Sequence, residues 1–251
     1  MMLQLGEDSL YYETFDGDAA RPVLVFLHEG LGCTAMWKDF PRRLCEATGC
    51  AGLVYDRLGY GQSSPMRQRR SIHYLHESAL IELPQVLARL VAGRDYVLVG
   101  HSDGGSIALM HAAARPSGLR GVVTVAAHVF VEPLTLEGVR VARDAHGAGK
   151  LRGLHRYHGD KAEAVFFAWA DTWLEPAFVN WNIEYLLPSI ECPLLAMQGR
   201  DDQYGSCSQL DAIAAQAVNA SKLVVDDCGH SPHLEQPDAL VDYMAEFIQQ
   251  L

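Results

Sequence analysis

The chain has 251 residues, of which 49% are hydrophobic and 20% charged, enough for one sizeable α/β domain or two small ones. Its 31 acidic and 20 basic residues give a formal net charge of −11, which disfavours nucleic acids and anionic membrane surfaces as partners. No run of 18 or more apolar residues occurs, and residues 1–15 lack the pattern of a signal peptide, so we expect a cytoplasmic protein.

The cysteines and histidines give no metal or redox signal. The six cysteines are scattered and form no C-x-x-C pair, so we expect reduced and mostly buried thiols rather than a zinc site or a redox dithiol. His155 and His158 lie one helical turn apart, but no third ligand accompanies them, so we expect a surface or cap position rather than a metal site. The cysteines are Cys33, Cys45, Cys50, Cys192, Cys207 and Cys228.

The first part of the chain alternates apolar runs with helical patterns. Residues 10–15 resemble an early edge strand, and residues 23–27 (VLVFL) form the continuous apolar run that a buried parallel strand needs. A glycine-bearing loop, 28–32, follows this strand. The other elements expected here are helix 35–47, strand 52–55 with the glycine-rich turn 56–63, and helix 74–91, bent at Pro84.

The chain is organised around residues 94–111, RDYVLVGHSDGGSIALMH. A short apolar run precedes the turn Gly100-His101-Ser102-Asp103-Gly104, and small residues that suit a helix follow it. The turn fits G-x-S-x-G, in which a serine sits on a strained strand-to-helix turn with glycines where no side chain has room. The helix N-terminus behind such a serine directs backbone N–H groups towards its hydroxyl, which suits acyl transfer.

The pattern changes after the next predicted strand, 119–126. Residues 128–188 hold no convincing buried strand but many aromatic residues, so we predict a helical cap inserted between strands of the main sheet. Alternation then resumes with strand 194–197, a helix near 208–217, strand 222–225 and a last helix, 237–251. We therefore predict an α/β core domain of residues 1–127 and 189–251, with a mostly parallel sheet and helices on both faces.

Two later strand ends supply an acid and a base. A serine hydroxyl needs a base within hydrogen-bond reach and a carboxylate that orients the base. Asp201 and Asp202 follow strand 194–197, and His230 follows strand 222–225. Both loops are expected at the same sheet edge as Ser102, in the chain order Ser, Asp, His, so the three side chains should converge.

Together these motifs resemble those of the α/β-hydrolase fold superfamily, over essentially the whole chain. The motifs are the HEGLG loop, DRLGYGQSS, GHSDGG, GRDD and CGHSPHLEQP before a terminal helix. The resemblance, which lies with serine esterases and hydrolases of meta-cleavage products, implies that Ser102 is the nucleophile and His230 the base. It implies that Asp202 is the acid, with Asp201 as the neighbouring alternative.

The oxyanion that forms on attack needs preorganised N–H donors. The resemblance places one donor on the backbone of Asp103 and the second on Gly30, with Glu29 as the runner-up. Many relatives have H-G-x at this loop, so Glu29 puts a carboxylate where glycine is usual. We favour an ion pair or N–H acceptor that stiffens the loop, with Arg57 as a candidate partner; a part in activating water or selecting substrates is the alternative.

Three residues are candidates for the pocket: Glu29, His101 and His233. His101 and His28 lie beside strand ends, where imidazoles often satisfy backbone groups, so we expect mainly structural roles for these two. For His233 two roles are equally open: it lines the pocket, or it supports the site from behind. Two or three cap aromatic residues should also face Ser102, because an apolar acyl or alcohol group must be buried.

The function expected from these residues is that of a serine carboxylesterase acting on small to medium esters. Ser102 attacks the ester carbonyl, and His230 takes its proton and returns it to the leaving alcohol. Asp202 orients the imidazole, the N–H groups of Asp103 and Gly30 hold the oxyanion, and water then releases the acid. The partner is a small-molecule ester or related carbonyl compound, no cofactor is required, and a homodimer is compatible with the sequence.

Other functions remain open at this point. The triad and the GRDD loop also resemble those of hydrolases that cleave carbon–carbon bonds in ring-fission diketones, although the pocket residues of that branch are not matched in the divergent cap. Lactonase, thioesterase and aminopeptidase activities share the fold, and a non-catalytic receptor for a small hydrophobic molecule is a further alternative. Haloalkane dehalogenases and epoxide hydrolases are disfavoured, since they have aspartate where this chain has Ser102.

Overall fold

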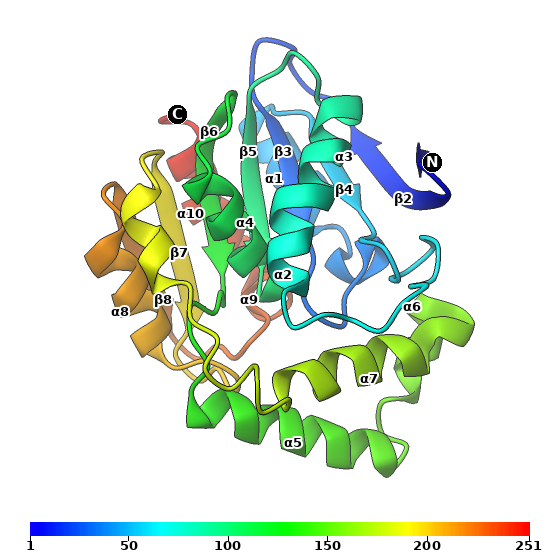
Figure 1. The fold of residues 1–251 in the computed structure, drawn as a ribbon. Helices are drawn as coiled ribbons and strands as arrows, with labels where there is room; N and C mark the ends of the chain where they lie inside the picture. Colours follow the sequence, from blue (N-terminus) through cyan, green and yellow to red (C-terminus); the bar gives the residue numbers. More distant parts are fainter.

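The computed structural model describes residues 1–251 and contains a single eight-stranded sheet (Figure 1). The strand order is β1-β2-β4-β3-β5-β6-β7-β8; β1 and β2 are antiparallel to their neighbours, and all later pairs are parallel. The strands are β1 (Met2–Leu5), β2 (Asp8–Phe15), β3 (Val23–Leu27), β4 (Gly52–Tyr55), β5 (Tyr96–His101), β6 (Leu119–Val125), β7 (Leu194–Gly199) and β8 (Ala220–Val225).

Helices cover both faces of the sheet, as its continuous apolar strands require. In β3 the side chains alternate between two cores: Leu24 and Phe26 belong to a core with α1 and α10, whereas Val25 belongs to the larger core with α3, α4 and α8. The helices are α1 (Phe40–Thr48), α2 (Tyr74–Glu77), α3 (Leu83–Leu90), α4 (Asp103–Ala113), α5 (Pro133–Gly147), α6 (His155–His158), α7 (Ala162–Trp173), α8 (Cys207–Gln216), α9 (Pro232–Glu235) and α10 (Pro237–Ile248). The predicted α/β fold with a mostly parallel sheet is confirmed.

Three local predictions need correction. One edge of the sheet is β1, which the sequence did not predict, and the predicted edge strand is β2 beside it. Helix 74–91 is divided into α2, a wide π-helical turn at Ser78–Glu82, and α3, because Pro84 lacks the N–H that a regular turn would use. Helix 35–47 is divided into a 3₁₀ turn and α1 at Lys38, which has a φ of 57°.

Between β6 and β7 the chain leaves the sheet and forms α5, α6 and α7. These helices lie together across the carboxyl ends of the strands, at the bottom of Figure 1. Apart from an isolated bridge between Phe130 and Asn182, residues 128–188 form no β-structure. This inserted segment therefore faces the sheet edge at which Ser102 lies.

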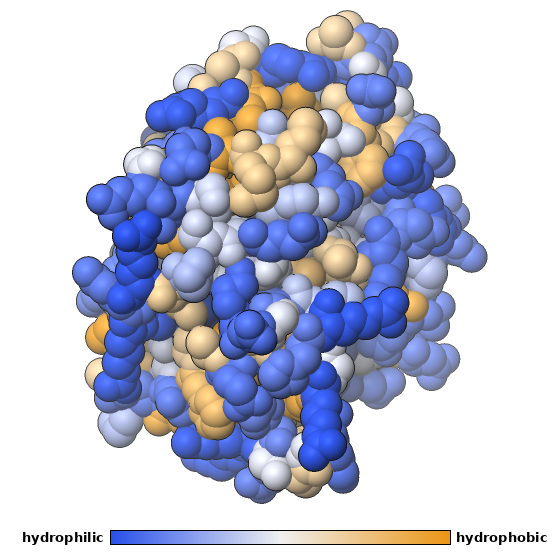
Figure 2. Space-filling model, turned by 90° about the vertical axis from the view of Figure 1, so that its right-hand side faces the viewer, coloured by the Kyte–Doolittle hydropathy of each residue, from blue (hydrophilic) through white to orange (hydrophobic).

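The outer surface is mixed in character. The side of the molecule shown in Figure 2 is mostly hydrophilic and is interrupted by small apolar patches. None of the helices combines the length and the apolar character needed to cross a membrane.

Two glycines let α4 start against the strands. A Cβ atom on Gly104 would lie 1.9 Å from the carbonyl oxygen of Leu27 in β3, and one on Gly100 would lie 2.2 Å from the carbonyl oxygen of Gly104. Both obstacles are backbone atoms, which cannot rotate away. Close approach of backbone to backbone, rather than flexibility, explains the glycines of G-x-S-x-G.

We expect Gly104→Ala to lower the free energy of unfolding by about 3 kcal/mol or to prevent folding, because the added methyl group overpacks a rigid contact. Gly147→Ala is the matched control, since a Cβ there meets nothing within 4 Å. Urea unfolding of both variants measures the difference. Equal stability of the two variants would contradict the close approach.

Candidate active site

Ser102 occupies the sharp turn between β5 and α4. Its backbone has a φ of 52° and a ψ of −116°, a conformation that costs energy for a residue with a side chain. The Ser102 N–H donates to the carbonyl oxygen of Val125 at the end of β6, 2.8 Å away, which fixes the turn against the sheet. The residue is 8% exposed, so its hydroxyl lies in a largely enclosed site.

The structure brings Ser102, His230 and Asp202 together from three loops. His230 Nε2 lies 3.0 Å from Ser102 Oγ, and His230 Nδ1 lies 2.8 and 2.9 Å from the two carboxylate oxygens of Asp202. The neighbouring Asp201 is exposed, and no contact joins its side chain to His230. Of the two acids left open by the sequence, Asp202 is the one in contact with the imidazole.

The Asp202 carboxylate is buried and held by three further donors. Gln198 Nε2 donates to Oδ2 at 2.6 Å, and the backbone N–H groups of Tyr204 and Gly205 donate to Oδ1 at 2.8 and 3.2 Å. Burial by itself raises the pKa of this carboxyl, but the hydrogen bond and charge of His230 outweigh it and lower the pKa. Asp202 is therefore a charged acceptor with a fixed orientation.

The loop after β3 lies beside Ser102. The Gly30 N–H has no hydrogen-bond partner in the protein, as an oxyanion donor requires. A Cβ on Gly30 would lie 2.4 Å from Trp169 Cδ1 and 3.2 Å from Asp103 Oδ2, so Gly30 is packed between the inserted helix α7 and the start of α4. The two residues predicted to supply the oxyanion donors are thus neighbours in space.

Arg57 does not pair with the Glu29 carboxylate, contrary to the partner suggested by the sequence. The Arg57 guanidinium is 2% exposed and donates to the backbone carbonyl oxygens of Glu29, at 2.9 Å, and His28, at 3.2 Å. It also lies 3.7 Å from the carboxylate of Asp103. The carboxylate of Glu29 lies instead 3.5 Å from His101 Nδ1. Arg57 therefore holds the loop through its backbone.

Asp103 is connected to the inserted segment by a chain of hydrogen bonds that the sequence analysis missed. Tyr74 in α2 donates its hydroxyl to Asp103 Oδ2 at 2.9 Å, and Trp173 in α7 donates its indole N–H to the Tyr74 oxygen at 3.0 Å. The only sequence signal was an acidic residue next to the serine and an arginine in the glycine-rich turn. Neither reveals Tyr74 or Trp173.

Most other histidines near the site satisfy backbone groups. His28 Nε2 accepts from the Arg57 N–H at 3.1 Å while Nδ1 lies 2.8 Å from the Glu29 carbonyl oxygen, and burial lowers the pKa of His28 well below its ordinary range. His158 is a buried residue of the inserted segment, which accepts from the Gly61 N–H and lies 2.8 Å from the Leu31 carbonyl oxygen.

No group of three or more histidine, cysteine, aspartate or glutamate side chains is placed to hold a metal ion.

His233 lies behind the site rather than in an open pocket. It is 4% exposed, and its ring packs against Trp37, Phe40 and His101 with centroids 4.8, 5.9 and 4.6 Å apart. Burial, with a smaller contribution from His101, lowers the pKa of His233 to about 3. The folded protein therefore keeps this imidazole neutral near neutral pH.

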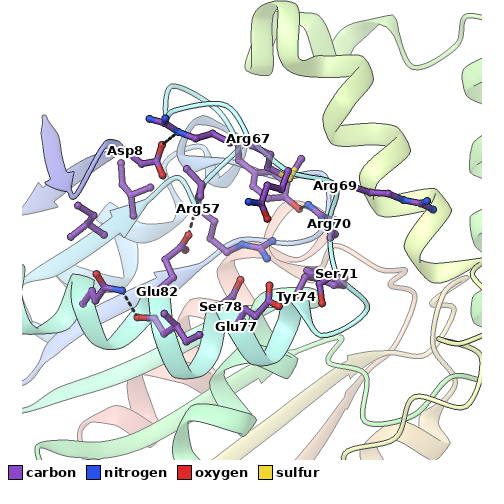
Figure 3. Close-up of a pocket in the computed structure, with 18 residues that line it drawn as sticks. Asp8, Arg57, Arg67, Arg69, Arg70, Ser71, Tyr74, Glu77, Ser78 and Glu82 are labelled. Atoms are coloured by element: carbon purple, nitrogen blue, oxygen red, sulfur yellow. Dashed lines mark hydrogen bonds and ion pairs between the residues drawn. The ribbon is translucent and has the colours of Figure 1, made fainter.

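A cavity of about 560 Å³ lies beside this region but excludes the three central residues (Figure 3). Arg57 and Tyr74 line it, with Glu82, whose Oε2 accepts from the Leu58 N–H at 2.9 Å. Its outer arginines are already engaged: Arg67 pairs with Asp8 and Glu7, and Arg70 donates to the Tyr60 hydroxyl. The cavity, which lies behind Asp103, is thus lined by both polar and apolar side chains.

The fold and these loops define a class of protein. Residues 24–243 match the model of the alpha/beta hydrolase family, and the chain belongs to this family. The motifs quoted from the sequence all fall within or beside the matched residues.

Individual relatives have different names. The chain is 25% identical to a 2-succinyl-6-hydroxy-2,4-cyclohexadiene-1-carboxylate synthase of Enterobacter sp. (strain 638), covering 94% of this chain and 95% of the relative. An enol-lactonase from Burkholderia xenovorans LB400 matches with a TM-score of 0.77 at 16% identity, over 99% of each chain. A bacterial membrane phospholipase A matches with a TM-score of 0.81 at 22% identity, over 100% of this chain and 85% of that one. The two structures show a shared fold.

The state of His233 makes stability depend on pH. Between pH 6.5 and about 3 the unfolded chain binds a proton at His233 that the folded protein does not, so this residue makes stability fall as pH falls. We expect His233→Gln to reduce the slope of unfolding free energy against pH by up to about 1.4 kcal/mol per pH unit in that window. Urea unfolding at several pH values, with the exposed His155→Gln as control, measures it; an unchanged slope would contradict a neutral His233.

Proposed function

We propose that the protein is a serine carboxylesterase that works through an acyl-enzyme intermediate. One observation carries the proposal: His230 lies 3.0 Å from the Ser102 hydroxyl on one side and 2.8 Å from Asp202 on the other. This is the geometry in which an imidazole removes the serine proton while a carboxylate orients the ring. Membership of the alpha/beta hydrolase family supports hydrolytic chemistry in general.

In the proposed reaction Ser102 Oγ attacks the ester carbonyl carbon as its proton moves to His230 Nε2. The negative charge that develops on the carbonyl oxygen is held by the backbone N–H groups of Gly30 and Asp103. Collapse breaks the bond to the alcohol oxygen, which takes the proton from His230 and leaves. Water, deprotonated by His230, then attacks the acyl carbon and releases the carboxylic acid and free Ser102.

The surroundings favour uncharged, mainly apolar substrates. Trp169 packs over Gly30, and the ring of Tyr204 lies with its centroid 4.8 Å from that of His230. The nearest buried cation, Arg57, is engaged by backbone carbonyl oxygens and Asp103. A substrate carboxylate would therefore find acidic and aromatic neighbours rather than a free cation, and we propose small to medium neutral esters.

A second candidate follows from the curated relatives. Their similarity covers nearly the whole chain, and their name describes formation of a cyclohexadiene carboxylate rather than ester hydrolysis. The same serine and histidine could serve that chemistry, or the cleavage of carbon–carbon bonds in ring-fission diketones. Because Arg57 is already engaged, it is not free to pair with the carboxylate that this name contains, which makes the synthase reaction the weaker choice.

We expect the wild-type protein to hydrolyse p-nitrophenyl esters and Ser102→Ala to reduce kcat by about 10⁴-fold or more, since the variant has no nucleophile. Initial rates on a series from acetate to laurate, beside one ring-fission diketone, measure this and the preferred chain length. Ser117→Ala, on an exposed serine, is the control and should keep full activity. Preference for the diketone, or turnover that survives in Ser102→Ala, would overturn the proposal.

The two adjacent acids allow a matched comparison. We expect Asp202→Asn to lower kcat by about 10⁴-fold with little change in KM, because an amide does not hold the imidazole in the required tautomer. Asp201→Asn, one residue earlier and exposed, should stay within about twofold of the wild type. Ester kinetics on the two variants decide between the acids, and a larger loss in Asp201→Asn would reverse the assignment.

A further inference from the structure

His101 forms a buried contact with the loop that carries His230. Its side chain is 2% exposed, and its Nε2 lies 2.8 Å from the backbone carbonyl oxygen of His230. A carbonyl oxygen only accepts hydrogen bonds, so Nε2 must carry a proton and donate it. The imidazole of His101 therefore holds the main chain of His230 rather than its ring.

The second nitrogen of His101 faces a carboxylate. Nδ1 lies 3.5 Å from Glu29 Oε2 and has no hydrogen-bond partner in the protein. A carboxylate attracts this nitrogen only when the nitrogen also carries a proton. Burial by itself raises the pKa of Glu29, but His101, with smaller contributions from His28 and His233, outweighs burial and lowers it.

Two further histidines pack around His101, and the ring centroid of His230, the proposed base, lies 5.2 Å from that of His101. His233 lies 4.6 Å away between ring centroids and is neutral, since its pKa is about 3. Trp37 covers another side, with its ring centroid 6.2 Å from that of His101. Glu29 is the acidic group that faces the His101 ring; its side chain is 19% exposed and its carboxylate lies against Gly32.

We propose that Glu29 and a doubly protonated His101 form an ion pair that positions the proposed catalytic groups relative to one another. The inference rests on the proposed function of Ser102 and His230. Glu29 directly precedes Gly30, His101 directly precedes Ser102, and His101 holds the carbonyl of His230. The pair therefore connects three segments: the loop after β3 that carries Gly30, the turn that carries Ser102, and the loop that carries His230.

This role differs from substrate binding. Glu29 and His101 are positioning residues, because they act through the backbone of the groups that would touch the substrate. A shift of about 1 Å in such a group can cost about 100-fold in rate. Loss of the pair should therefore lower kcat and leave KM nearly unchanged.

The first test reads the protonation of His101 directly and needs no activity. Nitrogen-15 NMR of histidine-labelled wild-type protein at about pH 8 should show one imidazole with protons on both ring nitrogens, assigned by its disappearance in His101→Gln. In Glu29→Gln that signal should change to a ring with a single proton. A singly protonated His101 in the wild type would overturn the proposal, whether or not esters are hydrolysed.

The second test uses ester kinetics. We expect His101→Ala to lower kcat by about 100-fold and Glu29→Gln by about 10-fold, with KM within about twofold. His101→Gln should recover part of the His101→Ala loss and keep about the 10-fold loss of Glu29→Gln, because its neutral amide N–H can donate to the His230 carbonyl but cannot form the ion pair. Glu46→Gln, on an exposed glutamate of α1, should match the wild type.

The outcomes separate the proposals. Unchanged kcat in His101→Ala, a rise in KM alone, or equal losses in His101→Ala and His101→Gln would overturn the positioning role. A wild-type protein that hydrolyses no ester would overturn the proposed function, while the NMR result still decides whether the ion pair exists. Thermal unfolding of each variant shows whether a loss of kcat merely follows a loss of folded protein.

Discussion

The close packing of α4 against the ends of β3 and β5 is the constraint on which the candidate site depends. Gly104 lies so near the Leu27 carbonyl oxygen that no side chain fits, and Ser102, two residues earlier in the same turn, has a positive φ. The turn places the serine hydroxyl at the carboxyl edge of the sheet, where parallel strands direct their loops. The loops after β3, β7 and β8 meet the serine there.

Three contacts between an acidic and a basic side chain surround Ser102: Glu29 with His101, Asp103 with Arg57, and Asp202 with His230. Removing a charge from water is costly unless a partner compensates, so each pair constrains both loops that supply it. Together they connect all the loops around Ser102. Such a site needs little reorganisation when charge develops in a reaction, which is how preorganised groups stabilise transition states.

The inserted helices complete the site from the opposite side. Trp169 packs over Gly30, and Trp173 is connected to Asp103 through Tyr74, so α7 contacts the loop after β3 and is linked to the start of α4. The names of similar proteins include a synthase, a lactonase and a phospholipase, and the structures of the last two share this fold. A shared fold thus accompanies different named activities, because fold by itself does not fix function.

The sequence by itself determined the α/β alternation, the turn at Ser102 and the residues that meet there. The spacing of apolar residues, the spacing of the glycines and the position of polar residues after each strand are local patterns that can be recognised without the structure. It did not determine the short edge strand β1, the partner of Glu29, or the contacts of Tyr74 and Trp173 with Asp103. These depend on the direction of side chains from segments far apart in the chain. Only the packed structure brings such segments together, so only the structure decided that the Glu29 carboxylate meets His101, while Arg57 binds the Glu29 backbone carbonyl.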